Sequence, residues 1–190
     1  MDKESYNNKK YVEPTICHEW GHVLASYLLY GTLKNIVSID FEDIPAGVFG
    51  HTKMFDFYVE IDKGLPSIYL IDKEKEKEIM ILLAGVIATK ICGLSKGRFH
   101  SYDTDKVKIE ELTKDKKLIS KLRNKTEEML LPLKDTLQAL TRCALEDYPK
   151  SRDNDNEKYY QIPSETIIEW VCAYLPESMH PQKVYSTKQS

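Results

Sequence analysis

Several features that mark common protein classes are missing from this sequence. Its four cysteines are scattered and form no C-x-x-C pair, which fits a reducing compartment better than a disulfide framework. There is no G-x-x-x-x-G-K-[ST] loop, so the chain carries no phosphate-binding motor motif. The longest apolar run, IMILLAGVIA at residues 79–88, is about half the length that spans a bilayer. We therefore expect no membrane segment.

The charge balance and the first residues exclude two further classes. The chain has 190 residues and a net charge of −3, with no basic patch that would favour nucleic acid as a partner. Residues 1–13 are polar and lack the apolar region of a secretory signal. These features predict a cytoplasmic protein that does not bind nucleic acid.

The stretch TICHEWGH at residues 15–22 points to chemistry. His18 and His22 stand four residues apart, and Glu19 follows the first of them directly. Positions i and i+4 share one face of an α-helix, so both imidazoles can reach one metal ion. Glu19 lies one position round the helix, where it can reach a metal-bound water. This H-E-x-x-H pattern predicts one Zn²⁺ per chain, with Glu19 as the general base.

The residues around the motif predict the helix that it needs. Pro14 suits a first helical turn, and Gly31 suits a C-terminal stop. The alternative is that two histidines merely share a face of a core helix. A zinc site is favoured because the histidines flank an apolar stripe instead of pointing into solvent; the stripe consists of Ile16, Trp20, Val23, Leu24, Tyr27 and Leu28.

The rest of the chain predicts a mainly α protein of the α+β class, with a small sheet after the first helix. Residues 32–41 and 53–61 are strand candidates, separated by the turn-rich residues 42–52. A helix follows, with Asp72 as its cap and Gly93 as its stop. Small residues in this helix indicate that another helix approaches closely; they are Ala84, Gly85 and Ala88.

The C-terminal half is predicted to be helical. A long stretch from about residue 103 to residue 148 contains Pro132, which should kink or split it. Residues 148–161 are predicted to form a polar loop, and residues 163–175 a last helix capped by Ser164. We therefore expect one domain over residues 14–175. Residues 1–13 precede it as a polar segment, and residues 176–190 follow it as a disordered tail.

A catalytic zinc usually has three protein ligands and one open position, so a third ligand is needed. The candidates are Asp103, Asp105, His100 and the glutamates of residues 74–78. The positions four and seven residues after Asp105 are the apolar Ile109 and Leu112, whereas Glu110 lies seven after Asp103. A ligand should face the apolar side, so Asp105 is favoured and Asp103 is the alternative. Helix capping is the competing role for either aspartate.

The order of these motifs resembles the peptidase domain of the FtsH-type ATP-dependent zinc proteases. HEWGH is similar to the family's His-Glu-Ala-Gly-His helix, and LKNIVSIDF and GHT are similar to its strand and its G-x-T step. LLAGVIATKICG resembles the following helix, and HSYDTD the Ser-x-Asp segment that carries the third zinc ligand. The resemblance covers about residues 14–175, although Thr89 and Trp20 depart from the family pattern. It implies a zincin-like peptidase domain that stands alone, without the AAA motor.

The leading hypothesis is a zinc metalloendopeptidase that cleaves extended or unfolded polypeptides. A strand near residues 34–40 or 53–61 would present an edge to the substrate. One alternative is a regulatory zinc peptidase of the ImmA/IrrE type, with a glutamate such as Glu78 as third ligand. Another is a catalytically silent zinc-binding adaptor, against which the intact Glu19 argues. The substrate, homo-oligomerisation and a separate motor partner stay open.

Overall fold

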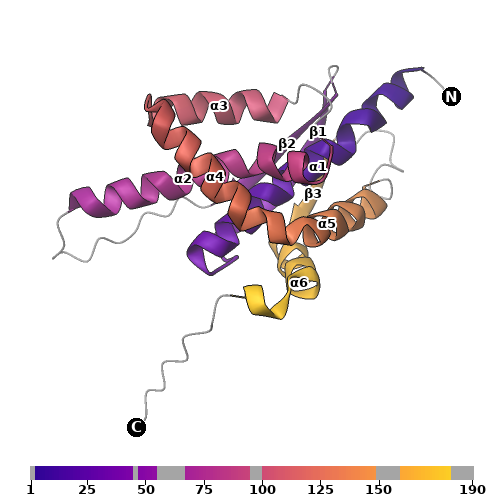
Figure 1. The fold of residues 1–190 in the computed structure, drawn as a ribbon. Helices are drawn as coiled ribbons and strands as arrows, with labels where there is room; N and C mark the ends of the chain where they lie inside the picture. The colour runs from indigo at the N-terminus through magenta and orange to yellow at the C-terminus, as the bar shows by residue number, and fades with distance from the viewer. Residues whose placement is uncertain (1–2, 45–46, 55–66, 95–99, 149–158, 181–190) are drawn as a thin grey trace, which may run out of the picture.

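The computed structural model describes residues 3–44, 47–54, 67–94, 100–148 and 159–180. In this part of the chain the fold is mostly helical with one small antiparallel sheet (Figure 1), which confirms the predicted α+β class. The elements in chain order are α1 (Lys3–Tyr30), β1 (Ile36–Ile44), β2 (Gly47–Met54), α2 (Ser67–Ile91), α3 (His100–Leu112), α4 (Lys116–Leu130), η1 (Leu131–Leu133), α5 (Lys134–Asp147), β3 (Tyr159–Pro163), α6 (Ser164–Tyr174) and η3 (Glu177–Met179).

Helix α1 is longer than predicted at its N-terminus. It begins at Lys3, so Pro14 lies inside the helix and not in its first turn. Most of residues 1–13, expected as a polar segment before the domain, therefore belong to α1. Burial of Val12 and Ile16 on both sides of Pro14 explains this, because packing outweighs the hydrogen bond that proline removes. The predicted stop is correct: Gly31 has a φ of 71° and its N–H donates to the Tyr27 carbonyl.

The sheet has the order β2-β1-β3, with β1 in the centre. Ile39 of β1 lies opposite Thr52 of β2 on one side and Ile162 of β3 on the other. Residues 42–52 were predicted as a turn, but most of them extend the two strands of a hairpin. Of the strand predicted at residues 53–61, only Lys53 and Met54 belong to β2, and the remainder lies outside the described residues.

Strand β3 falls partly within the predicted polar loop, which is therefore wrong for residues 159–161. The sequence pattern did not predict β3 because the strand has only five residues. Two of them, Tyr160 and Ile162, are buried, which gives too short an apolar pattern to identify a strand.

Helices α1 and α2 pack backbone to backbone. A Cβ on Gly21 would lie 2.5 Å from the Ala84 carbonyl oxygen and 2.8 Å from the Ala88 Cβ, so the predicted close approach is confirmed. Helix α2 begins at Ser67, which places Asp72 inside it and not at its cap. It ends at Ile91, before Gly93 with a φ of 75°.

The predicted helical stretch from residue 103 to residue 148 is three helices. Pro132 lies in η1 and separates α4 from α5, as expected. A further break precedes α4, where the Asp115 carboxylate accepts hydrogen bonds from the backbone of Lys117 and Leu118. The predicted Ser164 cap is wrong, because Ser164 is the first residue of α6 and no side chain caps that helix.

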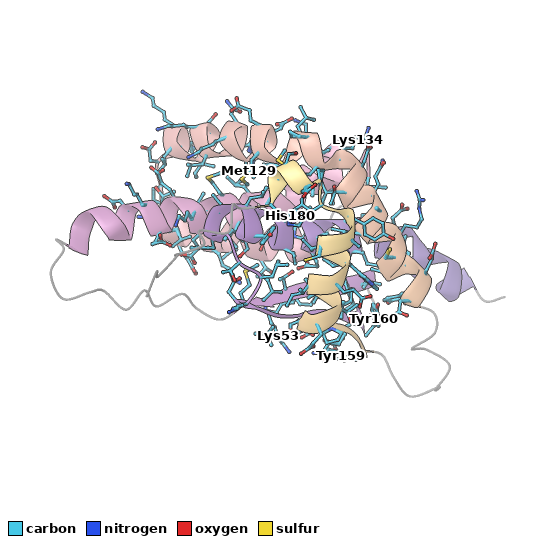
Figure 2. The ribbon with its side chains drawn as sticks, turned by 90° about the horizontal axis from the view of Figure 1, so that it is seen from below. Lys53, Met129, Lys134, Tyr159, Tyr160 and His180 are labelled. Carbon is cyan, nitrogen blue, oxygen red and sulfur yellow. The ribbon has the colours of Figure 1, made fainter. Side chains whose placement is uncertain are left out.

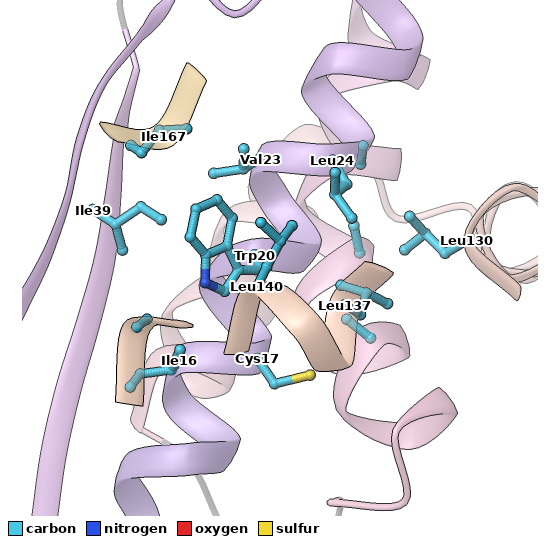
Figure 3. Close-up of a cluster of buried hydrophobic side chains, with 14 of the residues drawn as sticks. Ile16, Cys17, Trp20, Val23, Leu24, Ile39, Leu130, Leu137, Leu140 and Ile167 are labelled. Carbon is cyan, nitrogen blue, oxygen red and sulfur yellow. The ribbon is translucent and has the colours of Figure 1, made fainter. Parts of the chain in front are cut away.

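Trp20 fills the centre of the hydrophobic core and has no exposed surface. Figure 3 shows it among Ile39 from β1, Leu140 from α5 and Ile167 from α6. The core therefore joins the first helix, the sheet and the last two helices. The neighbouring face of α1, with His18 and His22, packs toward α2 and α3.

The chain stays ordered beyond the predicted domain boundary. Residues 177–179 form η3, and His180 follows it directly (Figure 2). The Tyr27 hydroxyl lies 3.1 Å from Nδ1 of His180. The tail predicted for residues 176–190 is thus structured to His180, and residues 181–190 lie outside the described range. None of the helices that the structure describes combines the length and apolarity needed to cross a bilayer.

Candidate metal centre

Three side chains from two helices converge on one point. Oδ2 of Asp105 lies 2.9 Å from Nε2 of His18 and 3.2 Å from Nε2 of His22. All three residues are buried, and their ligand atoms lie within 4.8 Å of one another. The structure thus brings together the histidine pair and the aspartate favoured from sequence, in a group that can hold a metal ion.

The apolar register of α3 positions Asp105. Ile109, one turn further along α3, is buried against the rest of the protein, and Leu112 is half-buried. Asp103 is exposed in the first turn of the helix. The predicted orientation of α3 is therefore confirmed, and Asp103 does not join the group.

The ring of His22 is oriented by α2. Its Nδ1 lies 2.7 Å from the Ile81 carbonyl oxygen. Because a carbonyl only accepts, Nδ1 carries a proton and Nε2 is the nitrogen directed at Asp105. Nε2 donates to the carboxylate when the ring is protonated, and it offers a lone pair to a metal ion when the ring is neutral. A backbone partner of this kind on the outer ring nitrogen is typical of metal-binding histidines.

The ring of His18 fits into a space left by Gly85 of α2. A Cβ on Gly85 would lie 2.5 Å from both Cε1 and Nε2 of His18. Any side chain at position 85 would therefore displace the ring. The small residues of α2 serve two purposes, since they admit the backbone of α1 and one of its histidines.

The electrostatics of the group favour a positive charge. Burial lowers the pKa of His22, but the nearby Asp105 carboxylate outweighs this and raises it to about 9. Burial also raises the pKa of Asp105, but the charge of His22 and hydrogen bonds from both histidines hold that pKa below its usual range. Without a metal, the proton on His22 therefore supplies the positive charge beside the Asp105 carboxylate. Two imidazole nitrogens and one carboxylate oxygen are also a donor set that suits Zn²⁺.

Glu19 follows His18 directly on α1, lines the same cavity as His22 and Asp105, and is itself buried. Its Oε2 accepts a hydrogen bond of 2.8 Å from the Thr52 hydroxyl. Its Oε1 is also buried, and no residue in the described ranges hydrogen-bonds to it. A buried carboxylate oxygen without a partner fits a group that acts on a bound water.

A cleft of about 960 Å³ opens onto the group. Glu19, His22 and Asp105 line it, together with residues 49–54 of β2. Because β1 is paired on both sides, the first predicted edge, near residues 34–40, is wrong. Of the second, residues 53–61, Lys53 and Met54 belong to β2, which is an edge strand of the described sheet beside the cleft. The strand edge that lines the cleft therefore consists mostly of residues that the sequence predicted as a turn.

Among the described side chains, the other candidates from the sequence do not join the group. Glu74 and Glu78 line the cleft from α2, and Glu74 pairs with Lys77 at 2.8 Å. His100 is the first residue of α3, and its side chain lies outside the described residues. Sequence reasoning assigned no role to Thr52; its place in the GHT step after a strand was the available signal.

Comparisons with known proteins add no relative. No protein-family model matches this chain, and neither does any curated protein or solved structure. The likeness to the FtsH-type peptidase domain rests on the motifs quoted above and stays a prediction, so the interpretation of this site depends on its own geometry.

Proposed function

We propose that this chain is a zinc-dependent metallopeptidase that hydrolyses peptide bonds of extended or unfolded polypeptides. The observation that carries the proposal is the convergence of His18, His22 and Asp105 at a cleft that the buried Glu19 also lines. A purely structural zinc site is closed by four protein ligands and needs no base. Three ligands and an adjacent carboxylate at a cleft are the arrangement of a hydrolytic site.

His18, His22 and Asp105 would hold the ion. When bound, zinc supplies a Lewis acid that polarises a carbonyl and activates a water. The Ile81 carbonyl keeps His22 in the tautomer that offers Nε2. Gly85 leaves the room in which the His18 ring lies against α2. These contacts hold the ligands in place before an ion arrives, which lowers the cost of binding it.

Glu19 would act as the general base. Its Oε2 is held by Thr52, while Oε1 has no hydrogen-bond partner in the described part of the chain. This oxygen is available to take a proton from the attacking water and return it to the leaving amine. Proton transfer of this kind is typically worth about 10²–10⁴-fold in rate.

Strand β2 would bind the substrate. It is an edge strand of the described sheet and lines the cleft over residues 49–54. An extended peptide can add to such an edge through main-chain hydrogen bonds that are independent of its sequence. We therefore propose that unfolded segments are the substrates, because a folded chain cannot present an extended backbone to the cleft.

The test compares two glutamates that line the same cleft. Glu19→Gln should lower kcat on an unfolded protein substrate by about 10²–10⁴-fold, since it removes the base but leaves a residue of equal size. Zinc content, measured by elemental analysis, should stay at one per chain. Glu78→Gln is the matched control, because Glu78 lines the cleft but lies outside the metal-ligand group, and should keep both zinc and activity.

Three other outcomes would contradict the proposal. Undiminished turnover in Glu19→Gln would show that Glu19 is not the base. Loss of zinc in Glu78→Gln would favour an ImmA/IrrE-type ligand set. A wild-type protein that binds zinc tightly but cleaves no unfolded substrate would be a silent zinc-binding adaptor.

A further inference from the structure

Thr52 of β2 connects the sheet to the base of the proposed site. Its hydroxyl donates to Oε2 of Glu19 at 2.8 Å, while the Glu19 backbone carbonyl oxygen lies 3.4 Å away. Both Thr52 and Glu19 are buried. We propose that Thr52 is a positioning residue, whose hydroxyl holds the Glu19 carboxylate in the orientation that general-base catalysis requires. This inference rests on the proposed peptidase function and deepens it.

Gly50 shapes the other side of the same carboxylate. A Cβ on Gly50 would lie 2.8 Å from Oε1 and 2.9 Å from Cγ of Glu19. The carboxylate thus lies directly against the backbone of β2, two residues before Thr52. Strand β2 therefore restricts the orientation of the carboxylate at both oxygens. Thr52 donates a hydrogen bond to Oε2, and the backbone at Gly50 packs closely against Oε1.

A glutamate needs such restraint to act as a base. Its side chain has several rotatable bonds, and holding such a long side chain in one conformation costs conformational entropy. Misplacement of a reacting group by about 1 Å can cost about 10²-fold in rate. The Thr52 hydroxyl offsets this cost in the folded protein and leaves the second carboxylate oxygen for the water.

The same interface provides a matched hydroxyl whose hydrogen bond goes to the backbone and not to the Glu19 carboxylate. One helical turn earlier, Thr15 of α1 donates to the Val48 carbonyl of β2 at 3.3 Å. Both hydroxyls are buried and both join α1 to β2. Only the Thr52 hydroxyl bonds to the carboxylate, so a comparison of the two separates positioning from general support of the helix–strand contact.

The kinetic experiment uses the zinc-loaded, full-length chain. Thr52→Val keeps the shape of the side chain but removes the donor, and should lower kcat by about tenfold, in line with a hydrogen bond to a charged group. KM and zinc stoichiometry should not change. Thr52→Ser should restore most of the activity, and Thr15→Val should keep the wild-type kcat. In the Glu19→Gln background, Thr52→Val should have no further effect.

A second measurement does not depend on activity. In a double-mutant cycle on the zinc-free protein, urea unfolding should show that Thr52→Val is coupled to Glu19→Ala more strongly than Thr15→Val is, because only the Thr52 hydroxyl bonds to the carboxylate. A wild-type protein without peptidase activity would contradict the proposed function, and this cycle would still decide whether Thr52 holds the carboxylate.

Three outcomes of these experiments would overturn the inference. An equal loss of kcat in Thr15→Val and Thr52→Val would assign both to structure. A further loss from Thr52→Val in the Glu19→Gln background would show that Thr52 acts on something other than Glu19. Absence of coupling in the unfolding cycle would remove the contact on which the inference rests.

Discussion

Asp103 and Asp105 stand two residues apart on α3, yet only one of them faces the histidines. Two positions on an α-helix differ by about 200° in direction. Asp105 shares its side with the buried Ile109, whereas Asp103 is exposed. At the scale of single residues, the metal group therefore depends on which side of α3 faces α2. The carboxylate is at the metal group because the apolar residues of α3 place it there.

The first prediction concerns this pair. Asp105→Ala should weaken zinc binding by at least about 10–100-fold. Loss of a residue that only hydrogen-bonds to a metal ligand typically costs that much, and loss of a ligand should cost more. Asp103→Ala is the matched control and should leave zinc affinity unchanged. Competition with a chelating dye at fixed pH measures both constants. If Asp103→Ala lost the metal and Asp105→Ala kept it, the ligand assignment would be wrong.

At the scale of elements, the contact between α1 and α2 governs the histidines. Gly21 lets the two backbones meet, and Gly85 gives the ring of His18 its space. Ile81 on the same helix orients His22. Helix α2 supplies no member of the metal-ligand group itself, yet it sets where both imidazoles lie. Its sequence is constrained on the face that meets α1, and small side chains are required there.

The second prediction tests Gly85. In an open helix, replacing glycine by alanine would stabilise the protein by roughly 0.5–1 kcal/mol. Here the new Cβ would lie 2.5 Å from the His18 ring, so Gly85→Ala should instead lower both stability and zinc affinity. Urea unfolding and zinc titration measure the two effects. A gain in stability with normal zinc binding would show that the ring does not need this space.

Gly93 is the control for the glycine substitution. It follows α2 with a φ of 75°, and a Cβ there would meet no atom within 4 Å. Gly93→Ala should therefore cost about 1–2 kcal/mol of stability through the left-handed backbone alone. Its zinc affinity should remain that of the wild type, because no metal-ligand contact changes.

At the scale of the whole molecule, the metal group joins distant parts of the chain. His18 and Asp105 are 87 residues apart in sequence, and they meet only when α1, α2 and α3 are packed together. The unfolded chain does not present the three ligands at one point. Metal binding and the tertiary fold are therefore linked, and each should stabilise the other.

The third prediction follows from this linkage. Free zinc at about 100 times its dissociation constant should raise the free energy of unfolding by about 2.7 kcal/mol. EDTA should reverse the effect, and Asp105→Ala should abolish it. Thermal or urea unfolding with and without the metal measures the difference. Equal midpoints for the two forms of the wild type would rule out a preformed site that binds zinc.

The effect of zinc should also depend on pH. The pKa of His22 is raised from 6.5 to about 9 in the metal-free protein, so a proton competes with zinc below that pH, and the stabilisation by zinc should shrink as pH falls. Conversely, the metal-free protein gains stability from protonated His22 that is fully present below about pH 6.5 and is lost as pH rises through about 9. Unfolding curves across this range, with and without zinc, measure both trends.

The sequence by itself determined the features that depend on neighbouring residues. The i, i+4 spacing of His18 and His22 puts both on one face of any helix. Gly31 and Gly93 end their helices because they adopt a left-handed backbone at little cost. The apolar residues after Asp105 orient its helix. Each of these follows from helix geometry or local sterics, which act over a few residues.

Only the tertiary structure decided the features that depend on burial against distant segments. Helix α1 continues through Pro14 because both halves of it are buried. In the described sheet, β2 and not the central β1 forms the edge beside the cleft. Thr52 meets Glu19 across 33 residues of sequence. Such contacts arise when whole elements pack, and the free energy of that packing outweighs the local preferences that a sequence pattern records.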